Sequence, residues 1–138
     1  FDHLARMPAG DLEREFEGFG YPTVRLQLHH MIGAEHYWMT LLAGSFVVTE
    51  EDAYPDLASL AAYRDEVAGL ARAWLETATT GILNEPKTYE TWGGKSKVLV
   101  PAAVFMRTQT HHFTHLGQIL AMVRLSGHPA RGLDFPLD

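Results

Sequence analysis

The chain has 138 residues, of which 46% are hydrophobic, and carries a formal net charge of −6. This length and composition predict one domain over residues 1–138 with a core of its own. Lysine and arginine are scattered and form no basic stripe, so the sequence predicts neither nucleic-acid binding nor attachment to an anionic membrane surface.

Cysteine is absent, which excludes disulfides, thiolate metal ligands and a cysteine nucleophile. Any metal ligands must therefore be histidine, aspartate or glutamate. The chain contains no apolar run approaching the roughly 20 residues of a membrane helix. It also lacks the pattern of a secretory signal, so we expect a cytoplasmic protein.

The first 22 residues predict short elements, because proline and glycine interrupt them repeatedly. The first long helix is expected over about residues 23–42. Thr23 is suited to cap its N-terminus, and Gly44 follows its end.

A second long helix is expected over about residues 56–78. Its predicted core positions are spaced three and four residues apart, as an amphipathic helix requires: Leu60, Tyr63, Val67, Leu70 and Trp74. Residues 88–92 and 95–100 are β-prone and flank Gly93-Gly94, which predicts a hairpin. The last helix is expected over residues 101–125, with Pro101 in its first turn.

These elements predict an all-α helical bundle with a small β-hairpin before the last helix. Three long helices expose apolar stripes that need partners. Residues 1–6 can be the end of a fourth helix whose first part is missing from the chain as given. A second subunit that supplies the missing face is the alternative.

The most informative motif is residues 111–119 (HHFTHLGQI) in the predicted last helix. His111 and His115 lie four residues apart, on one helix face and one turn apart. That face carries a core-like stripe: Val104, Thr108, His111, His115, Gln118, Met122 and Leu125. A buried imidazole is costly unless a partner satisfies it, and a metal ion would do so.

A third histidine is expected from the first long helix. Of the adjacent His29 and His30, only one can point directly into the core, and His30 is in register with Leu26 and Tyr37. His30, His111 and His115 therefore form a candidate triad, and three histidines with one open position are typical of catalytic zinc. The alternative is that these are buried histidines bonded to tyrosine, threonine or backbone groups.

The other histidines are expected outside the site: His3 and His128 in solvent, His36 and His112 as bystanders or at a dimer surface. Gln118 is expected to bond a ligand imidazole or a bound water, or to bridge helices. Tyr37 can line the pocket, although core packing is the alternative. No side chain stands out as a catalytic base.

Three segments resemble the DinB-like (DinB/YfiT) metalloenzyme family. Residues 30–38 (HMIGAEHYW) are similar to its H-(I/M)-x-x-A-E-x-x-W segment. Residues 111–119 resemble N-H-x-x-x-H-R-G-Q-I, except that Thr110 replaces the frequent asparagine and Leu116 the frequent arginine. Residues 125–135 resemble the L-x-G-x-P…L-D-F ending. The match runs from about residue 7 to the C-terminus.

The resemblance implies a four-helix bundle, often dimeric, whose three histidines hold a divalent metal. These correspond to His30, His111 and His115 here. The family's first helix is largely absent from the chain as given. Relatives include S-transferases that use low-molecular-weight thiols, and the family name reflects a damage-inducible gene.

The leading hypothesis is a metal-dependent enzyme that transfers a low-molecular-weight thiol to a small electrophile. Because cysteine is absent, the thiol must be a cosubstrate. The alternatives are a metal-dependent hydrolase and a non-enzymatic stress protein that binds a metal or ligand. Zinc, nickel or iron can each accept three imidazoles. We expect a homodimer with a small-molecule substrate.

Overall fold

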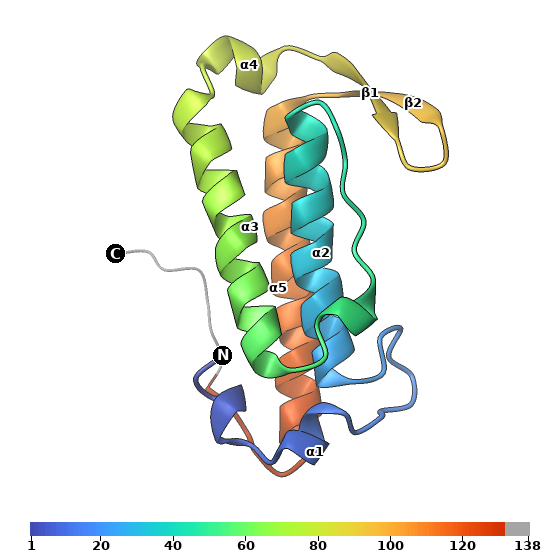
Figure 1. Cartoon of the computed structure of the whole chain (residues 1–138), viewed down its shortest axis with the longest axis vertical. Helices are drawn as coiled ribbons and strands as arrows, with labels where there is room; N and C mark the ends of the chain where they lie inside the picture. Colours follow the sequence, from blue (N-terminus) through green and yellow to red (C-terminus); the bar gives the residue numbers. More distant parts are fainter. Residues whose placement is uncertain (132–138) are drawn as a thin grey trace.

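The computed structural model describes residues 1–131. Three long helices lie side by side and form the body of the molecule (Figure 1). They are α2 (Val24–Leu42), α3 (Leu57–Thr77) and α5 (Pro101–Leu125). The shorter elements are two 3-10 turns (Leu4–Arg6, Glu51–Ala53) and two short helices, α1 (Ala9–Leu12) and α4 (Thr80–Asn84). The predicted helical fold is confirmed. In the part of the chain described, no helix is long and apolar enough to cross a membrane.

The starts of the long helices follow from local chemistry. The Thr23 hydroxyl accepts a hydrogen bond from the backbone N–H of Leu26, which confirms the expected cap of α2. Asp56 and Ser59 form a reciprocal capping box at the start of α3. Pro101 occupies the first turn of α5, where its missing N–H costs nothing.

The predicted hairpin joins β1 (Lys87–Thr91) to β2 (Lys95–Leu99) in antiparallel pairing, with Thr91 opposite Lys95. Gly93 and Gly94 turn the chain with φ of 80° and 69°, values that favour glycine. The backbone N–H of Trp92 donates to the Tyr37 hydroxyl over 3.1 Å. This bond ties the hairpin loop to the C-terminal half of α2.

Helix α2 packs against both α3 and α5, and the apolar core divides into two clusters along the bundle. The first includes Ile32 from α2 and Ile119 from α5. The second includes Met39 from α2 and Val104 from α5. On α5, His111 and His115 fall between Val104 and Ile119. The histidines thus occupy a polar level between two apolar clusters.

Two positions of the expected stripes are more exposed than predicted. Leu70 is 40% exposed and Leu125 is 61% exposed, so neither belongs to the core. In residues 1–6, where the end of a fourth helix was expected, the chain forms the single 3-10 turn Leu4–Arg6. Leu4 and Met7 are nevertheless buried in the first core cluster. The Leu-Asp-Phe segment at residues 133–135, part of the family resemblance, lies outside the described residues.

Candidate metal centre

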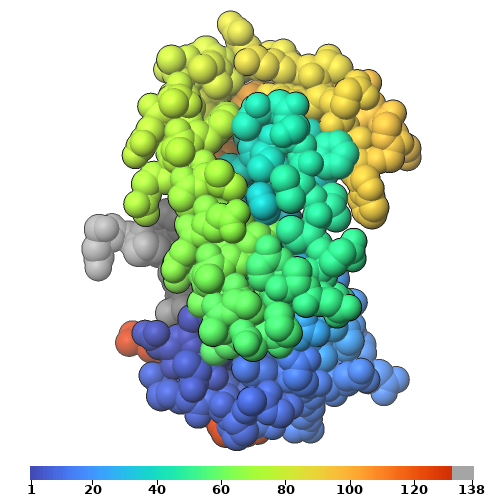
Figure 2. All heavy atoms as spheres, in the orientation of Figure 1, coloured from blue at the N-terminus to red at the C-terminus, as the bar shows by residue number. Residues whose placement is uncertain are grey.

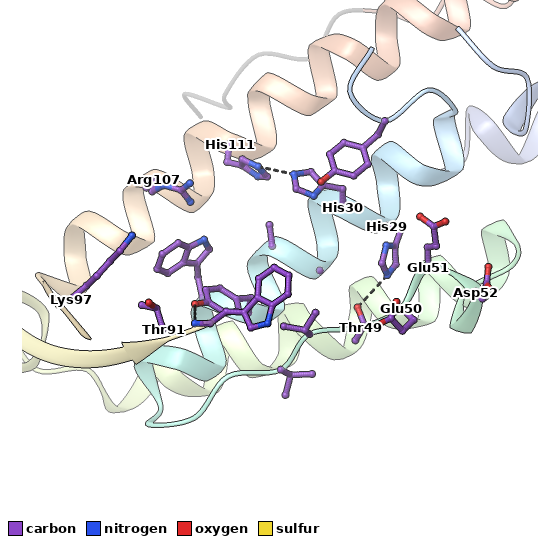
Figure 3. Close-up of a pocket in the computed structure, with 18 residues that line it drawn as sticks. His29, His30, Thr49, Glu50, Glu51, Asp52, Thr91, Lys97, Arg107 and His111 are labelled. Atoms are coloured by element: carbon purple, nitrogen blue, oxygen red, sulfur yellow. Dashed lines mark hydrogen bonds between the residues drawn. The ribbon is translucent and has the colours of Figure 1, made fainter. Parts of the chain in front are cut away.

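Three imidazole rings converge between α2 and α5. Nε2 of His111 lies 3.2 Å from Nε2 of His30 and 3.1 Å from Nε2 of His115. The nitrogens that the three rings offer to a metal all lie within 4.8 Å of one another. Figure 3 shows His30 and His111 facing each other from neighbouring helices. The three histidines predicted from the sequence are therefore brought together.

The spacing of the nitrogens suits a metal ion. Zinc binds imidazole nitrogen at about 2.0–2.1 Å, so two nitrogens on a tetrahedral ion lie about 3.3 Å apart. The two Nε2–Nε2 separations at His111 are close to this value. The same separations also permit N–H···N hydrogen bonds between neutral rings. Geometry therefore allows this group to hold a metal ion without large movements of the helices.

A buried glutamine orients one of the rings. Oε1 of Gln27 lies 2.6 Å from Nδ1 of His115, while Nε2 of Gln27 donates to the backbone oxygen of Tyr21 over 2.9 Å. Because the amide oxygen can only accept, the proton of His115 lies on Nδ1, and Nε2 keeps its lone pair for a ligand. Gln27 is fully buried, with 0% of its surface exposed. Its place on α2, three residues before His30, was a signal that the sequence prediction missed.

The other two rings are held differently. The Tyr21 ring stacks on His30, with centroids 4.0 Å apart and an interplanar angle of 19°. Nδ1 of His111 is buried and has no hydrogen-bond partner among the described residues. No protein hydrogen bond on Nδ1 thus fixes the orientation of His111. Tyr21 lies before α2, in a segment whose position the sequence pattern did not predict.

The environment favours neutral histidines. Burial, followed by the neighbouring His115 and His111, lowers the pKa of His30 to about 4. Burial, followed by His115 and the positive charge of Arg107, lowers the pKa of His111 to about 4. Burial also lowers the pKa of His115, although a hydrogen bond with Gln118 opposes the shift. Near neutral pH all three rings are in the form that binds metals.

The remaining predicted site residues lie around this group. Gln118 is half-buried one turn beyond His115, and its hydrogen bond opposes the lowering of the His115 pKa. Tyr37 lines the pocket and accepts the hydrogen bond from Trp92 that holds the hairpin. Tyr37 thus lies at the pocket wall and also has a packing role.

His36, expected as a bystander or at a dimer surface, and His29 lie outside the three-histidine group but inside the bundle. His36 is buried, and its Nδ1 lies 2.9 Å from the hydroxyl of Tyr63. His29 is also buried, with Nε2 3.1 Å from Oγ1 of Thr49, which in turn lies 3.0 Å from the Tyr63 hydroxyl. Helix α2 is covered by α5 on one face and by α3 on another, and both histidines point toward the α3 side. These rings form a second polar network, separate from the three-histidine group.

His112, His3 and His128 also have partners. Nε2 of His112 lies 3.2 Å from the backbone oxygen of Met31 and 3.4 Å from a carboxylate oxygen of Glu35. His3 contacts the backbone oxygen of His128, and His128 contacts Asp11. Neither chain-end histidine is therefore a freely solvated side chain. Glu35 pairs with His112 instead of joining the three-histidine group.

A pocket of about 680 Å³ lies against the three-histidine group. His30 and His111 line it, whereas the buried His115 lies behind them. In the space-filling view α5 is largely hidden behind α3, the α2–α3 connection and the N-terminal segment (Figure 2). The pocket walls include four aromatic side chains: Tyr21, Tyr37, Trp38 and Trp92. A small molecule can thus reach two of the three histidines.

Together, the fold and site define a class: helical-bundle proteins with a three-histidine group that could hold a metal ion. A comparison with protein families matches the DinB family over residues 1–138. The chain therefore belongs to the DinB family, as its sequence resemblance predicted. A comparison with curated proteins gives no match.

Proposed function

We propose that this protein is a metal-dependent transferase that joins a low-molecular-weight thiol to a small electrophile. The observation that carries the proposal is the convergence of three neutral imidazoles at a pocket. His30, His111 and His115 are the proposed ligands. Each presents Nε2 to the same point, and none contributes negative charge.

The charge of this group favours an anionic substrate atom. A divalent ion held by three neutral ligands keeps its full positive charge. Arg107, which lies one turn away on α5, adds a further positive charge. A metal bound there would act as a Lewis acid that lowers the pKa of a thiol. In the transfer, the thiol loses its proton to solvent, and its sulfur forms the new bond to carbon while the leaving group departs with the bonding electrons.

The residues of the chain itself bind and orient. Gln27 and Tyr21 hold the rings of His115 and His30, so that the histidines need not reorganise when a substrate arrives. The aromatic pocket walls offer apolar contacts to an electrophile. The thiol comes from outside, because the chain contains no cysteine.

The proposal is tested in two stages. Purified protein is first reconstituted with zinc, nickel or iron, and its metal content is measured by mass spectrometry. Metal-loaded protein is then incubated with a chlorinated aromatic electrophile, with and without cysteine as the thiol, and the thioether is quantified. We expect about one metal ion per chain and thioether formation above the uncatalysed rate.

Three results would contradict the proposal. Failure to bind any of these metals would leave the histidines as a buried polar group. Loss of the electrophile at the same rate with and without thiol would indicate a hydrolase at the same site. A metal whose removal unfolds the chain, with no reaction of thiol or electrophile, would favour a non-enzymatic stress protein.

Assembly and location are also proposals. We propose a cytoplasmic homodimer that forms through exposed apolar side chains of the long helices, among them Leu70, Met106 and Leu125. Sedimentation equilibrium tests the assembly. A monomer at all concentrations would contradict it.

A further inference from the structure

The pocket beside the three-histidine group has opposite charges at its two ends. Figure 3 shows Lys97 and Arg107 on one side of the His30–His111 pair, and residues 50–52 on the other. Residues 50–52 are Glu-Glu-Asp, and they supply the carboxylates that line the pocket in the described part of the chain. A ligand with one anionic group is therefore attracted to one end and repelled from the other.

Arg107 is positioned one helical turn from a proposed metal ligand. It precedes His111 by four residues on α5, a rise of about 6 Å along the same face. Its guanidinium carbon lies 4.9 Å from the centre of the Trp38 ring. This contact holds the cation at the pocket wall without neutralising it.

Lys97 comes from the hairpin and faces the same end of the pocket. On β2 it pairs with Tyr89, and the Trp92–Tyr37 hydrogen bond anchors the loop that connects the strands. Within residues 1–131, neither Lys97 nor Arg107 forms an ion pair with a carboxylate. Two consecutive elements, β2 and α5, thus place two uncompensated cations at one end of the pocket.

We propose that this Lys97–Arg107 end is a carboxylate-binding subsite, and that the thiol cosubstrate is one that carries a carboxylate group. The inference rests on the proposed function, because the sulfur is taken to lie at the three histidines. The carboxylate then extends along α5 toward Arg107, which offers two parallel N–H donors. The acidic end at residues 50–52 disfavours the reverse orientation.

A pair of matched thiols tests the subsite in cobalt-loaded protein. 3-Mercaptopropionate carries a carboxylate where 2-mercaptoethanol carries a hydroxyl group. The absorption band that arises when a thiolate binds cobalt gives the dissociation constant of each. We expect the ratio of the two constants to shift by about tenfold against the carboxylate in Arg107→Gln, and further when Lys97→Gln is added.

The control variants each remove one positive charge outside the pocket. Arg72→Gln on α3 and Lys87→Gln on β1 alter exposed cations that do not line the pocket, so the ratio should remain as in the unchanged protein. Arg107→Lys should retain part of the preference because it keeps the charge. Comparing ratios between variants cancels the intrinsic difference between the two thiols. Circular dichroism confirms that each variant is folded.

The outcomes separate the subsite from the proposed function. One outcome is that both thiols give the band while the ratio of their dissociation constants in Lys97→Gln/Arg107→Gln equals that of the unchanged protein. In that case the proposed subsite is wrong and the proposed thiol function stands. If neither thiol gives the band, the proposed function is wrong. The subsite is then decided by titrating zinc-loaded protein with succinate while following the Arg107 Nε–Hε resonance by NMR. A saturable shift that succinamide does not produce supports an anion site, and its absence overturns it.

Discussion

The side-chain oxygen of Gln27 lies 2.6 Å from Nδ1 of His115, and both side chains are buried. This contact joins α2 to α5 at the level of the three-histidine group. It fixes which nitrogen of His115 carries the proton, and so which one is free for a metal ion.

Gln27→Leu should lower metal affinity by about 10- to 100-fold, because it removes the acceptor that orients His115. Gln27→Glu should retain more affinity than Gln27→Leu, since one carboxylate oxygen accepts the same Nδ1–H. It should retain less than the unchanged protein, because the other oxygen replaces the amide nitrogen that donates to the backbone oxygen of Tyr21. Isothermal titration with zinc measures both, on variants whose circular dichroism is unchanged. Equal zinc affinities for the leucine and glutamate variants would show that the Gln27–His115 hydrogen bond does not contribute to metal binding.

His111→Ala should reduce metal affinity by at least about 100-fold, since loss of a ligand costs more than loss of its supporting partner. His112→Gln is the matched control, because His112 points instead toward Met31 and Glu35. Mass spectrometry of reconstituted proteins gives the metal content of each. Loss of metal in both variants would mean that the effect is structural and not due to ligation.

Metal-free protein should lose stability as the pH falls from about 6.5 to about 4. The pKa values of His30 and His111 are lowered to about 4 in the folded chain, whereas unfolded histidine titrates near 6.5. In this window the unfolded state binds more protons, so the free energy of unfolding decreases with decreasing pH. Above pH 6.5 these two groups should contribute no pH dependence.

Urea denaturation across this pH range measures the effect. The variant His30→Ala/His111→Ala should have a shallower dependence, and its remaining slope should come from groups such as His29 and His36, whose pKa values burial also lowers. An unchanged slope in the double variant would contradict the assignment of this pH dependence to the site.

Tyr63→Phe should destabilise the protein by about 1–3 kcal/mol, because the Tyr63 hydroxyl contacts both His36 and Thr49 inside the bundle. Metal content should not change, since this network is separate from the three histidines. Tyr54→Phe is the control: its ring stacks on Tyr63 at 4.0 Å and is preserved by the substitution. A similar loss of stability in both variants would argue against a specific role of the Tyr63 hydroxyl.

The sequence alone predicted the elements whose causes are local. The Thr23 cap, the Gly93-Gly94 turn and Pro101 each act within a few residues, so the helices and hairpin could be predicted from them. The pairing of His111 with His115 is also local, because the helical repeat places residues four apart on one face. Their convergence with His30 followed from matching the apolar stripes of two helices.

Only the tertiary structure decided what lies around these rings. Whether His29 or His36 is internal depends on α2 being covered on two faces, which its own repeat does not reveal. The Gln27–His115 contact spans 88 residues, and the Trp92–Tyr37 hydrogen bond that ties the hairpin carrying Lys97 to α2 spans 55. Such contacts depend on how separate elements pack, and short-range sequence patterns carry no information about that packing.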